Sequence, residues 1–536
     1  MKKILALTTV AIMGAVMVAG CLNQEAEEEQ LTFITPDTYP IETDVTLRYW
    51  MELSPHVSAS NTSFNTTEIA AYLEEATGIK VKFEHPVAGQ ADAAFNILQS
   101  SNDMPDIMER GWTDMPGGPE RLIREGVLTD LTPYIENVSP NLKGLLSENP
   151  DWAIQIMTDK GKYFEYPFIR PDEKLATFMT YIIRKDLLDK AGLAVPETLD
   201  EWEKALYAFK DMGIESPLSL RLSLSQFTRF SPFTGVFGIG STFYQVGGTV
   251  KYGPYEPEFA DYIKLLRKWY DDGILDKEFA DEDSKRRAAM VTNGKNGAID
   301  ATIGGEFGNY LSAILPDSGI EYVATKIPVR KAGDTPMFAQ KDWPVRDCAG
   351  ISGASKNKEL AARFLDFGYS EQGHMLYNFG KEGVSYEMKD GIPTYTGAVI
   401  DPEQNGDLSV AQGMAKYIRA CYNGPFEQDV NYITQYYQKD EQKQAMELWD
   451  SETLDYILPT SLNIEEAAQE RYTDIMTPIN TYLEDTLAKL VSGKLDIDYL
   501  DIYYTELKRL GIEEAIAIKQ TAYNNYLKRA RFVKYE

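Results

Sequence analysis

The residue types that most often carry out covalent or metal chemistry are rare in this chain of 536 residues and are scattered along it. It contains three histidines, His56, His85 and His374, and none of them lies in an H-E-x-x-H zinc motif or a catalytic-triad motif. The sequence also has no Walker lysine motif, so we do not expect the chain itself to hydrolyse ATP. The 82 aspartates and glutamates, by contrast, could supply the two carboxyl groups that a glycosidase needs.

One cysteine stands in a context that gives its thiol a definite role. Two lysines near the N-terminus precede an apolar stretch over residues 4–18, which is shorter than the ~20 residues that a membrane-spanning helix needs. The stretch ends in VAGC at 18–21, which resembles the lipobox of bacterial lipoproteins, whose cysteine is diacylated after cleavage before it. The alternative is an ordinary secretory peptide with an incidental cysteine. We predict a signal peptide over residues 1–20 and lipidation at Cys21. Two acyl chains on this cysteine would hold the protein stably at the extracellular face of the membrane.

The charge balance disfavours one class of partner. Acidic residues number 82 and basic residues 53, which gives a formal net charge of -29. Nucleic-acid affinity comes mainly from lysine and arginine, so we expect no nucleic-acid partner. Residues 21–44 are acidic and lack hydrophobic periodicity, which is typical of a flexible tether, here a lipidated one. Cys348 and Cys421 could pair or stay free, and the sequence leaves both possibilities open.

Strand patterns and helix patterns alternate along the chain. We predict strands at 45–51, 79–83, 104–108, 161–168 and 180–183, and helices at 66–77, 92–99, 184–191, 257–272, 360–367, 464–490 and 512–527. Gly78 and Gly192 stand where two helices should end, and Thr198 is the expected N-cap of another. The strand–helix–strand order of the first elements predicts a parallel sheet with helices on its faces. The C-terminal third is predicted to be mostly helical.

Several short stretches follow one another in a recognisable order. They are DMPDI at 103–107, GKYFEYP at 161–167, RKDLLDKAGL at 184–193, PETLDEW at 196–202, NGAI at 296–299 and QTAYNNY at 520–526. Their order over nearly the whole mature chain resembles the bacterial extracellular solute-binding proteins of family 1. The resemblance is to the long lipoprotein branch of that family, which serves carbohydrate ABC importers.

This resemblance implies an α/β, two-lobed, type II periplasmic-binding-protein-like fold with hinge strands and a helical C-terminal third. We place the first lobe at 45–175 and 346–405, and the second at 176–345 and 406–536. The implied function is capture of an oligosaccharide between the lobes by a lipid-anchored monomer, without catalysis. The closed form would deliver it to the permease subunits of an ABC importer.

One departure from the family concerns metal. Many long-branch relatives carry an EF-hand-like calcium loop after the helix that follows the P-x-T-x-D-E stretch. Residues 209–217 occupy that place here, without the alternating oxygen ligands that a seven-coordinate calcium ion needs. We therefore expect no metal site and no other cofactor.

Four residues at the ends of predicted strands match what a sugar requires. A sugar ring offers an apolar C–H face to aromatic side chains and a rim of hydroxyl groups to planar polar groups. Ligands of α/β sheets bind beyond the carboxyl ends of strands. Trp50 ends the first strand, and Arg110, Trp112 and Asp114 follow the strand at 104–108. Related maltodextrin binders place an aromatic residue, an aspartate and an arginine in the equivalent loop, in another order. A core position for Trp50 and a solvated pair of Arg110 and Asp114 are the alternatives.

Five further aromatic residues are candidate ligand contacts. They are Phe178 at the first crossing between lobes, Phe243 and Tyr244 in a glycine-rich region, Phe307 after a Gly-Gly-Glu turn, and Trp343 before the return crossing. Trp202 and Trp269 lie on the apolar faces of predicted helices instead, so we expect them in the core.

Two other functions are compatible with the sequence. A secreted glycoside hydrolase would release reducing sugar from its substrate, which a binding protein would not do. A binder of a peptide or another small solute would need an anion site for a carboxylate, and the sequence shows no clear basic cluster.

Overall fold

The strands of the computed structural model form two mixed sheets and two hairpins. The structure describes residues 33, 38–230, 233–280, 283–337, 343–449 and 455–533. Cys21 and the predicted signal peptide lie outside these residues.

The first sheet has the strand order β2-β1-β3-β11-β4. Its strands are β1 (Thr46–Trp50), β2 (Lys80–Glu84), β3 (Ile107–Glu109), β4 (Tyr166–Ile169) and β11 (Val345–Ile351). β1 runs parallel to β2 and β3, as the strand–helix–strand pattern predicted. β11 runs antiparallel to both β3 and β4. The predicted parallel arrangement of the first strands is therefore confirmed, and the sheet becomes mixed because β11 enters from a distant part of the chain in the opposite direction.

The second sheet has the order β10-β5-β9-β6. Its strands are β5 (Met179–Arg184), β6 (Ser216–Ser219), β9 (Asn296–Thr302) and β10 (Tyr322–Ala324). β5 is antiparallel to β9 and β10, whereas β6 is parallel to β9. The hairpins are β7 (Phe243–Val246) with β8 (Thr249–Tyr252), and β12 (Tyr386–Lys389) with β13 (Ile392–Tyr395).

Helices surround both sheets. Those up to β11 are α1 (Pro55–Ser58), α2 (Glu68–Thr77), α3 (Ala91–Ser101), α4 (Gly118–Arg124), α5 (Thr132–Val138), α6 (Pro140–Glu148), α7 (Pro150–Gln155), α8 (Glu173–Ala176), α9 (Lys185–Ala191), α10 (Leu199–Asp211), α11 (Leu224–Phe230), α12 (Glu258–Asp271), α13 (Ser284–Thr292) and α14 (Gly308–Ala313). Those after β11 are α15 (Lys358–Asp366), α16 (Glu371–Phe379), α17 (Gly397–Ile400), α18 (Pro402–Asn405), α19 (Val410–Met414), α20 (Val430–Tyr436), α21 (Asp440–Leu448), α22 (Glu466–Ser492), α23 (Leu500–Leu510) and α24 (Ile512–Leu527).

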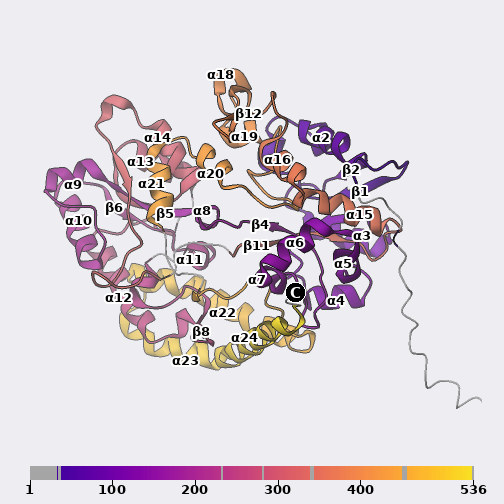
Figure 1. The fold of residues 1–536 in the computed structure, drawn as a ribbon. Helices are drawn as coiled ribbons and strands as arrows, with labels where there is room; N and C mark the ends of the chain where they lie inside the picture. Colours follow the sequence, from indigo (N-terminus) through magenta and orange to yellow (C-terminus); the bar gives the residue numbers. More distant parts are fainter. Residues whose placement is uncertain are drawn as a thin grey trace, which may run out of the picture. The chain divides into compact units, whose positions relative to one another are not determined.

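The capping signals in the sequence coincide with the observed helix ends. Thr198 and Glu201 form a reciprocal capping box at the start of α10. Gly78 and Gly192 end α2 and α9 in the left-handed conformation. Figure 1 shows α22, α23 and α24 packed beside one another, which confirms the helical character of the C-terminal part. Among the described helices, none combines the length and the apolar character needed to cross a bilayer.

Trp202 and Trp269 lie in the core beside the second sheet, as predicted. Both side chains are fully buried, at 0% exposure. Their rings make edge-on contacts with Phe233, at centroid distances of 5.1 Å and 5.7 Å. Such edge-to-face contacts add to the stabilisation that burial of the large rings provides.

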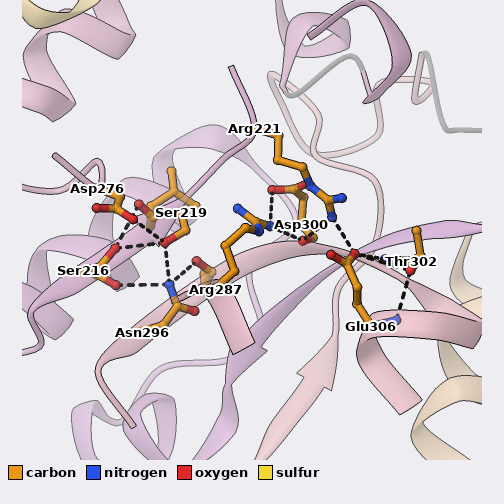
Figure 2. Close-up of polar contacts among 11 residues, drawn as sticks. Ser216, Ser219, Arg221, Asp276, Arg287, Asn296, Asp300, Thr302 and Glu306 are labelled. Carbon is orange, nitrogen blue, oxygen red and sulfur yellow. Dashed lines mark hydrogen bonds and ion pairs between the residues drawn. The ribbon is translucent and has the colours of Figure 1, made fainter. Parts of the chain in front are cut away.

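A polar network holds the strand ends of the second sheet in place (Figure 2). Asp300 of β9 accepts a hydrogen bond from Arg221 Nε at 2.7 Å and pairs with Arg287 Nη2 at 3.1 Å. Arg221 also pairs with Glu306 at 2.6 Å, in the π-helical turn Ile303–Phe307. Burial alone would raise the pKa of Asp300, but Arg287 and Arg221 outweigh burial and hold it below its usual range. The buried charge is therefore compensated from two sides, as a buried ion requires.

The stretch that occupies the place of the calcium loop of related proteins is a short connection. α10 ends at Asp211, and β6 begins at Ser216. Within the described ranges, no three histidine, cysteine, aspartate or glutamate side chains are grouped so that they could hold a metal ion. Cys348 and Cys421 are both free thiols.

Candidate ligand-binding site

A cavity of about 1090 Å³, which we call the main cavity, lies at one edge of the first sheet. Its wall includes Trp50 at the end of β1, Glu109 at the end of β3 and Arg346 at the start of β11. Because β11 is antiparallel to β3, its start and the carboxyl ends of β1 and β3 meet at the same edge. The cavity therefore occupies the edge at which α/β sheets bind ligands.

A buried ion pair between Arg419 and Glu109 lines the main cavity. Arg419 Nη2 lies 2.9 Å from Glu109 Oε2, and the side-chain exposures are 2% and 9%. Arg419 Nε also donates to the carbonyl oxygen of Asn423 at 2.7 Å, and the Tyr49 hydroxyl donates to Glu109. This pair therefore ties β1 and β3 to the loop at 419–423.

Tyr422, in that loop, has a hydroxyl group that no described residue satisfies. Solvent does not reach this oxygen, and it has no hydrogen-bond partner within the described part of the chain. The Tyr422 ring lies 5.5 Å from the Arg419 guanidinium carbon, and both residues line the main cavity. Because solvent does not reach this oxygen, a ligand in the cavity would contact other atoms of Tyr422.

Arg110 lines the main cavity and lies over two buried aromatic rings. Its guanidinium carbon is 4.3 Å from the centre of the Phe95 ring and 5.9 Å from that of Trp50. Its Nη2 pairs with Asp92 Oδ1 at 2.5 Å, on α3. Arg110 Nε is buried without a partner among the described residues. The side chain is thus held by its neighbours and keeps one donor unused.

Two acidic residues, Asp347 and Glu165, are close enough to interact at the main cavity. Asp347 accepts hydrogen bonds from the backbone N and the hydroxyl of Thr113, both at 2.7 Å. Burial raises the pKa of Asp347 to about 6. Glu165 accepts a hydrogen bond from Cys348 N at 2.8 Å, and burial, together with the nearby Asp347, raises its pKa well above the usual range. Asp347 lines the cavity, so it is the member of the pair that a ligand can contact.

A second cavity of about 390 Å³, which we call the side cavity, adjoins the main one. Thr113, Asp114, Met115 and Thr460 line both cavities. The rest of the side-cavity wall comes from the start of β7, residues 458–464, α22 and α24. The loop after β3 thus forms the boundary between the two spaces.

Four of the nine predicted contact residues line these cavities. Trp50 and Arg110 line the main cavity, Phe243 lines the side cavity, and Asp114 lines both. The structure thus brings together residues that lie up to 193 positions apart, Trp50 and Phe243, around one connected space. Their contact with a ligand stays a prediction.

Three predicted contact residues lie in the protein interior instead. Trp112 is fully buried, with its indole N–H donating to Cys348 O at 3.1 Å and its ring 6.1 Å from that of Phe95. Phe307 is also fully buried, and Tyr244 is 2% exposed. Phe243 and Tyr244 are neighbours in β7, so their side chains point to opposite faces and only Phe243 reaches the cavity. The prediction that these three rings face a ligand does not hold in this structure.

Phe178 and Trp343 are half-buried and line neither cavity. Phe178 packs against the core beside the second sheet. The Trp343 indole donates to Leu458 O at 3.1 Å, and Leu458 lines the side cavity. Trp343 therefore supports the cavity wall from behind.

Five cavity residues were not predicted from the sequence: Arg419, Tyr422, Asp347, Tyr472 and Lys519. All five are ordinary residue types without a motif of their own. The pairing of β11 with β3 brings Asp347 to the main cavity, and the return of the chain at 419–423 brings Arg419 and Tyr422. Tyr472 and Lys519 reach the side cavity from α22 and α24.

Comparisons with known proteins agree with this architecture. Residues 59–375 match the family model described as bacterial extracellular solute-binding protein. The fructooligosaccharide ABC transporter substrate-binding protein FusA of Streptococcus pneumoniae serotype 4 is 24% identical, over 91% of this chain and 92% of FusA. Lipoprotein LipO of Bacillus subtilis strain 168 is 25% identical, over 71% of this chain and 74% of LipO.

Solved structures show the same fold. FusA in complex with kestose aligns with a TM-score of 0.69 at 21% identity, over 90% of this chain and 100% of FusA. The alginate-binding protein AlgQ2 aligns with a TM-score of 0.69 at 22% identity, over 89% of this chain and 98% of AlgQ2. The predicted fold class is thereby confirmed.

Proposed function

The chain belongs to the bacterial extracellular solute-binding protein family, and on that premise we propose that it captures an oligosaccharide in the main cavity for an ABC importer. The observation that carries the proposal is the main cavity itself, which lies beyond the carboxyl ends of β1 and β3 and has arginine and carboxylate side chains in its wall. Sugar hydroxyls can pair with both kinds of group. The relationship to FusA, over almost the full length of both chains, supports a carbohydrate as the ligand.

The rest of the main cavity suits a ligand rich in hydroxyl groups. Arg110 and Arg346 offer guanidinium groups, and Glu52, Asp114 and Asp347 offer carboxylate acceptors. Such planar polar groups can each bind neighbouring hydroxyls of one sugar ring. Trp50 is 4% exposed, so only a small part of its ring can add an apolar contact for a C–H face.

We also propose two lobes that close on the ligand. The predicted ranges are 45–175 with 346–405, and 176–345 with 406–536. Contacts within the structure favour a boundary after residue 405 for the point at which the chain passes back to the second lobe. Phe426 packs on Phe168 of the first sheet, and Glu427 bridges to Ile169. The segment up to about residue 428 therefore belongs with the first lobe in our proposal. A ligand that contacts both lobes only when they are closed would shift the population to the closed form.

The relatives are binding proteins, and we propose that this chain also binds its glycan without hydrolysing it. The described residues that line the two cavities include no histidine and no cysteine. Carboxyl groups are present, so the distinction from a glycosidase depends on whether the glycan is recovered intact.

We propose that the protein acts as a monomer attached to the extracellular face of the cell membrane through lipid on Cys21. Changing Cys21→Ala removes the thiol that is acylated, and we expect the variant to leave the membrane fraction. Immunoblotting of membrane and soluble fractions measures this effect. A variant that stays in the membrane pellet as fully as the wild type would contradict lipidation at this residue.

A glycan panel tests the proposed function. The panel is an array of neutral and acidic oligosaccharides that includes sucrose, kestose and nystose, maltose to maltotetraose, and alginate oligosaccharides of two to four units. A glycan that binds only the folded chain, at a concentration of 100 times its Kd, adds about 2.7 kcal/mol to the free energy of unfolding. We therefore expect a higher melting temperature with at least one oligosaccharide, and no increase with any of them would overturn the proposal.

A further inference from the structure

Lys519 is a cation in the side-cavity wall that lacks an anionic partner. Its Nζ lies 5.3 Å from the centre of the Tyr472 ring and 5.9 Å from that of Phe243. Within the described part of the chain, no carboxylate lies within 4.0 Å of this nitrogen, and no group accepts a hydrogen bond from it. Other lysines nearby in sequence are paired, as Lys508 is with Glu513 at 2.9 Å.

The two rings account for only part of this arrangement. A lysine over aromatic faces gains cation–π attraction, but the rings do not accept the three N–H donors of the ammonium group as oxygen atoms would. Burial lowers the pKa of Lys519, and the charge of Asp114 acts in the opposite direction. The side chain is only half-buried and lines the side cavity, so a ligand in that cavity can accept hydrogen bonds from its ammonium group.

The position of Lys519 connects it with the main cavity. Asp114 lines both cavities, and its charge acts on Lys519 in the side cavity. The side-cavity wall also contains the amide-bearing side chains Asn463 and Gln469. An elongated ligand can therefore pass along the loop after β3 from one cavity to the other and find polar groups along its length.

We propose that the side cavity is a second sugar subsite, in which Lys519 donates hydrogen bonds to the hydroxyl oxygens of a neutral sugar unit beside Phe243 and Tyr472. Asp114 accepts hydrogen bonds from the same unit and disfavours an acidic one. The preferred substrate is then a neutral oligosaccharide long enough to fill both cavities. This inference rests on the proposed function and specifies its substrate class.

The inference predicts an effect of ligand length that a merely structural lysine would not show. Calorimetry with the fructan series (sucrose, kestose, nystose) and the malto series (maltose, maltotriose, maltotetraose) gives the affinity for two, three and four units. In the series that binds, we expect the wild type to gain at least tenfold in affinity from two units to four. Lys519→Met should lose most of that gain and keep the affinity for two units.

Two controls separate the subsite from folding effects. Lys508→Met removes an exposed lysine and should bind like the wild type. Lys519→Gln keeps hydrogen-bonding ability. It is the variant to use in place of Lys519→Met if Lys519→Met melts at a lower temperature than the wild type. Its affinity for four units should also fall, though by less.

Several outcomes would overturn the inference. An equal loss for two and four units, or no loss in either Lys519 variant, would show that the side cavity is not a subsite. Tighter binding of the four-unit alginate oligosaccharide than of the neutral four-unit glycans would overturn the assignment to a neutral unit. Absence of binding by every panel glycan would instead overturn the proposed function itself, and the two failures are therefore distinguishable.

Discussion

Arg419→Ala is expected to lower the free energy of unfolding by about 3–5 kcal/mol, because it leaves the buried carboxylate of Glu109 without its partner. The variant also loses the hydrogen bond to Asn423 O and the packing of the guanidinium against Phe64 and Tyr422. Because Arg419, Glu109 and Tyr422 line the main cavity, glycan affinity should fall as well. Urea unfolding followed by circular dichroism measures the loss of stability.

A matched exposed pair provides the control for Arg419→Ala. Arg471 pairs with Glu514 at 2.5 Å, but the two side chains are 55% and 47% exposed. Water and salt screen such a pair, so Arg471→Ala should unfold at almost the same urea concentration as the wild type. The double change Glu109→Gln with Arg419→Met removes both charges and should recover part of the loss. Stability of Arg419→Ala within about 1 kcal/mol of the wild type would contradict the account.

Asp300→Ala is expected to destabilise the protein by a similar ~3–5 kcal/mol. One carboxylate serves two arginines in this network, and its removal leaves Arg221 and Arg287 facing each other without the shared anion (Figure 2). Both arginine side chains are largely buried, at 12% and 6% exposure, so water cannot replace the lost interactions fully.

Asp300→Asn is the informative companion to this variant. It keeps one oxygen that can accept a hydrogen bond from Arg221 Nε, but it loses the negative charge and replaces the oxygen that accepts from Arg287 Nη2 by an NH2 donor. In the same urea titration, the free energy of unfolding of Asp300→Asn should lie between those of the wild type and Asp300→Ala. If both variants unfold like the wild type, the network does not hold the second sheet as described.

The local features of the fold were predictable because they depend on neighbouring residues. Gly78 can adopt the left-handed conformation that ends α2, and Thr198 can accept the hydrogen bond that begins α10. The apolar spacing along α12 likewise placed Trp269 in the core. Such signals lie within one helix and do not require knowledge of what packs against it.

The candidate site was predictable only where strand ends define it. Trp50 and Arg110 follow from the rule that ligands lie beyond the carboxyl ends of strands. Position in a loop does not tell which way a side chain points, however. Trp112 lies close to Arg110 in sequence, yet its ring is covered from β11, where Gly350 approaches it so closely that an added Cβ would lie 3.1 Å from the indole. That contact joins segments more than 230 residues apart, and no local pattern encodes it.

The capture of an intact oligosaccharide is tested most directly by calorimetric titration of the mature protein with the panel glycan that raises its melting temperature most, followed by mass analysis of the recovered glycan. The account predicts one glycan bound per chain, with its mass unchanged after prolonged incubation. No binding by any panel glycan, or recovery of a shortened glycan, would contradict it.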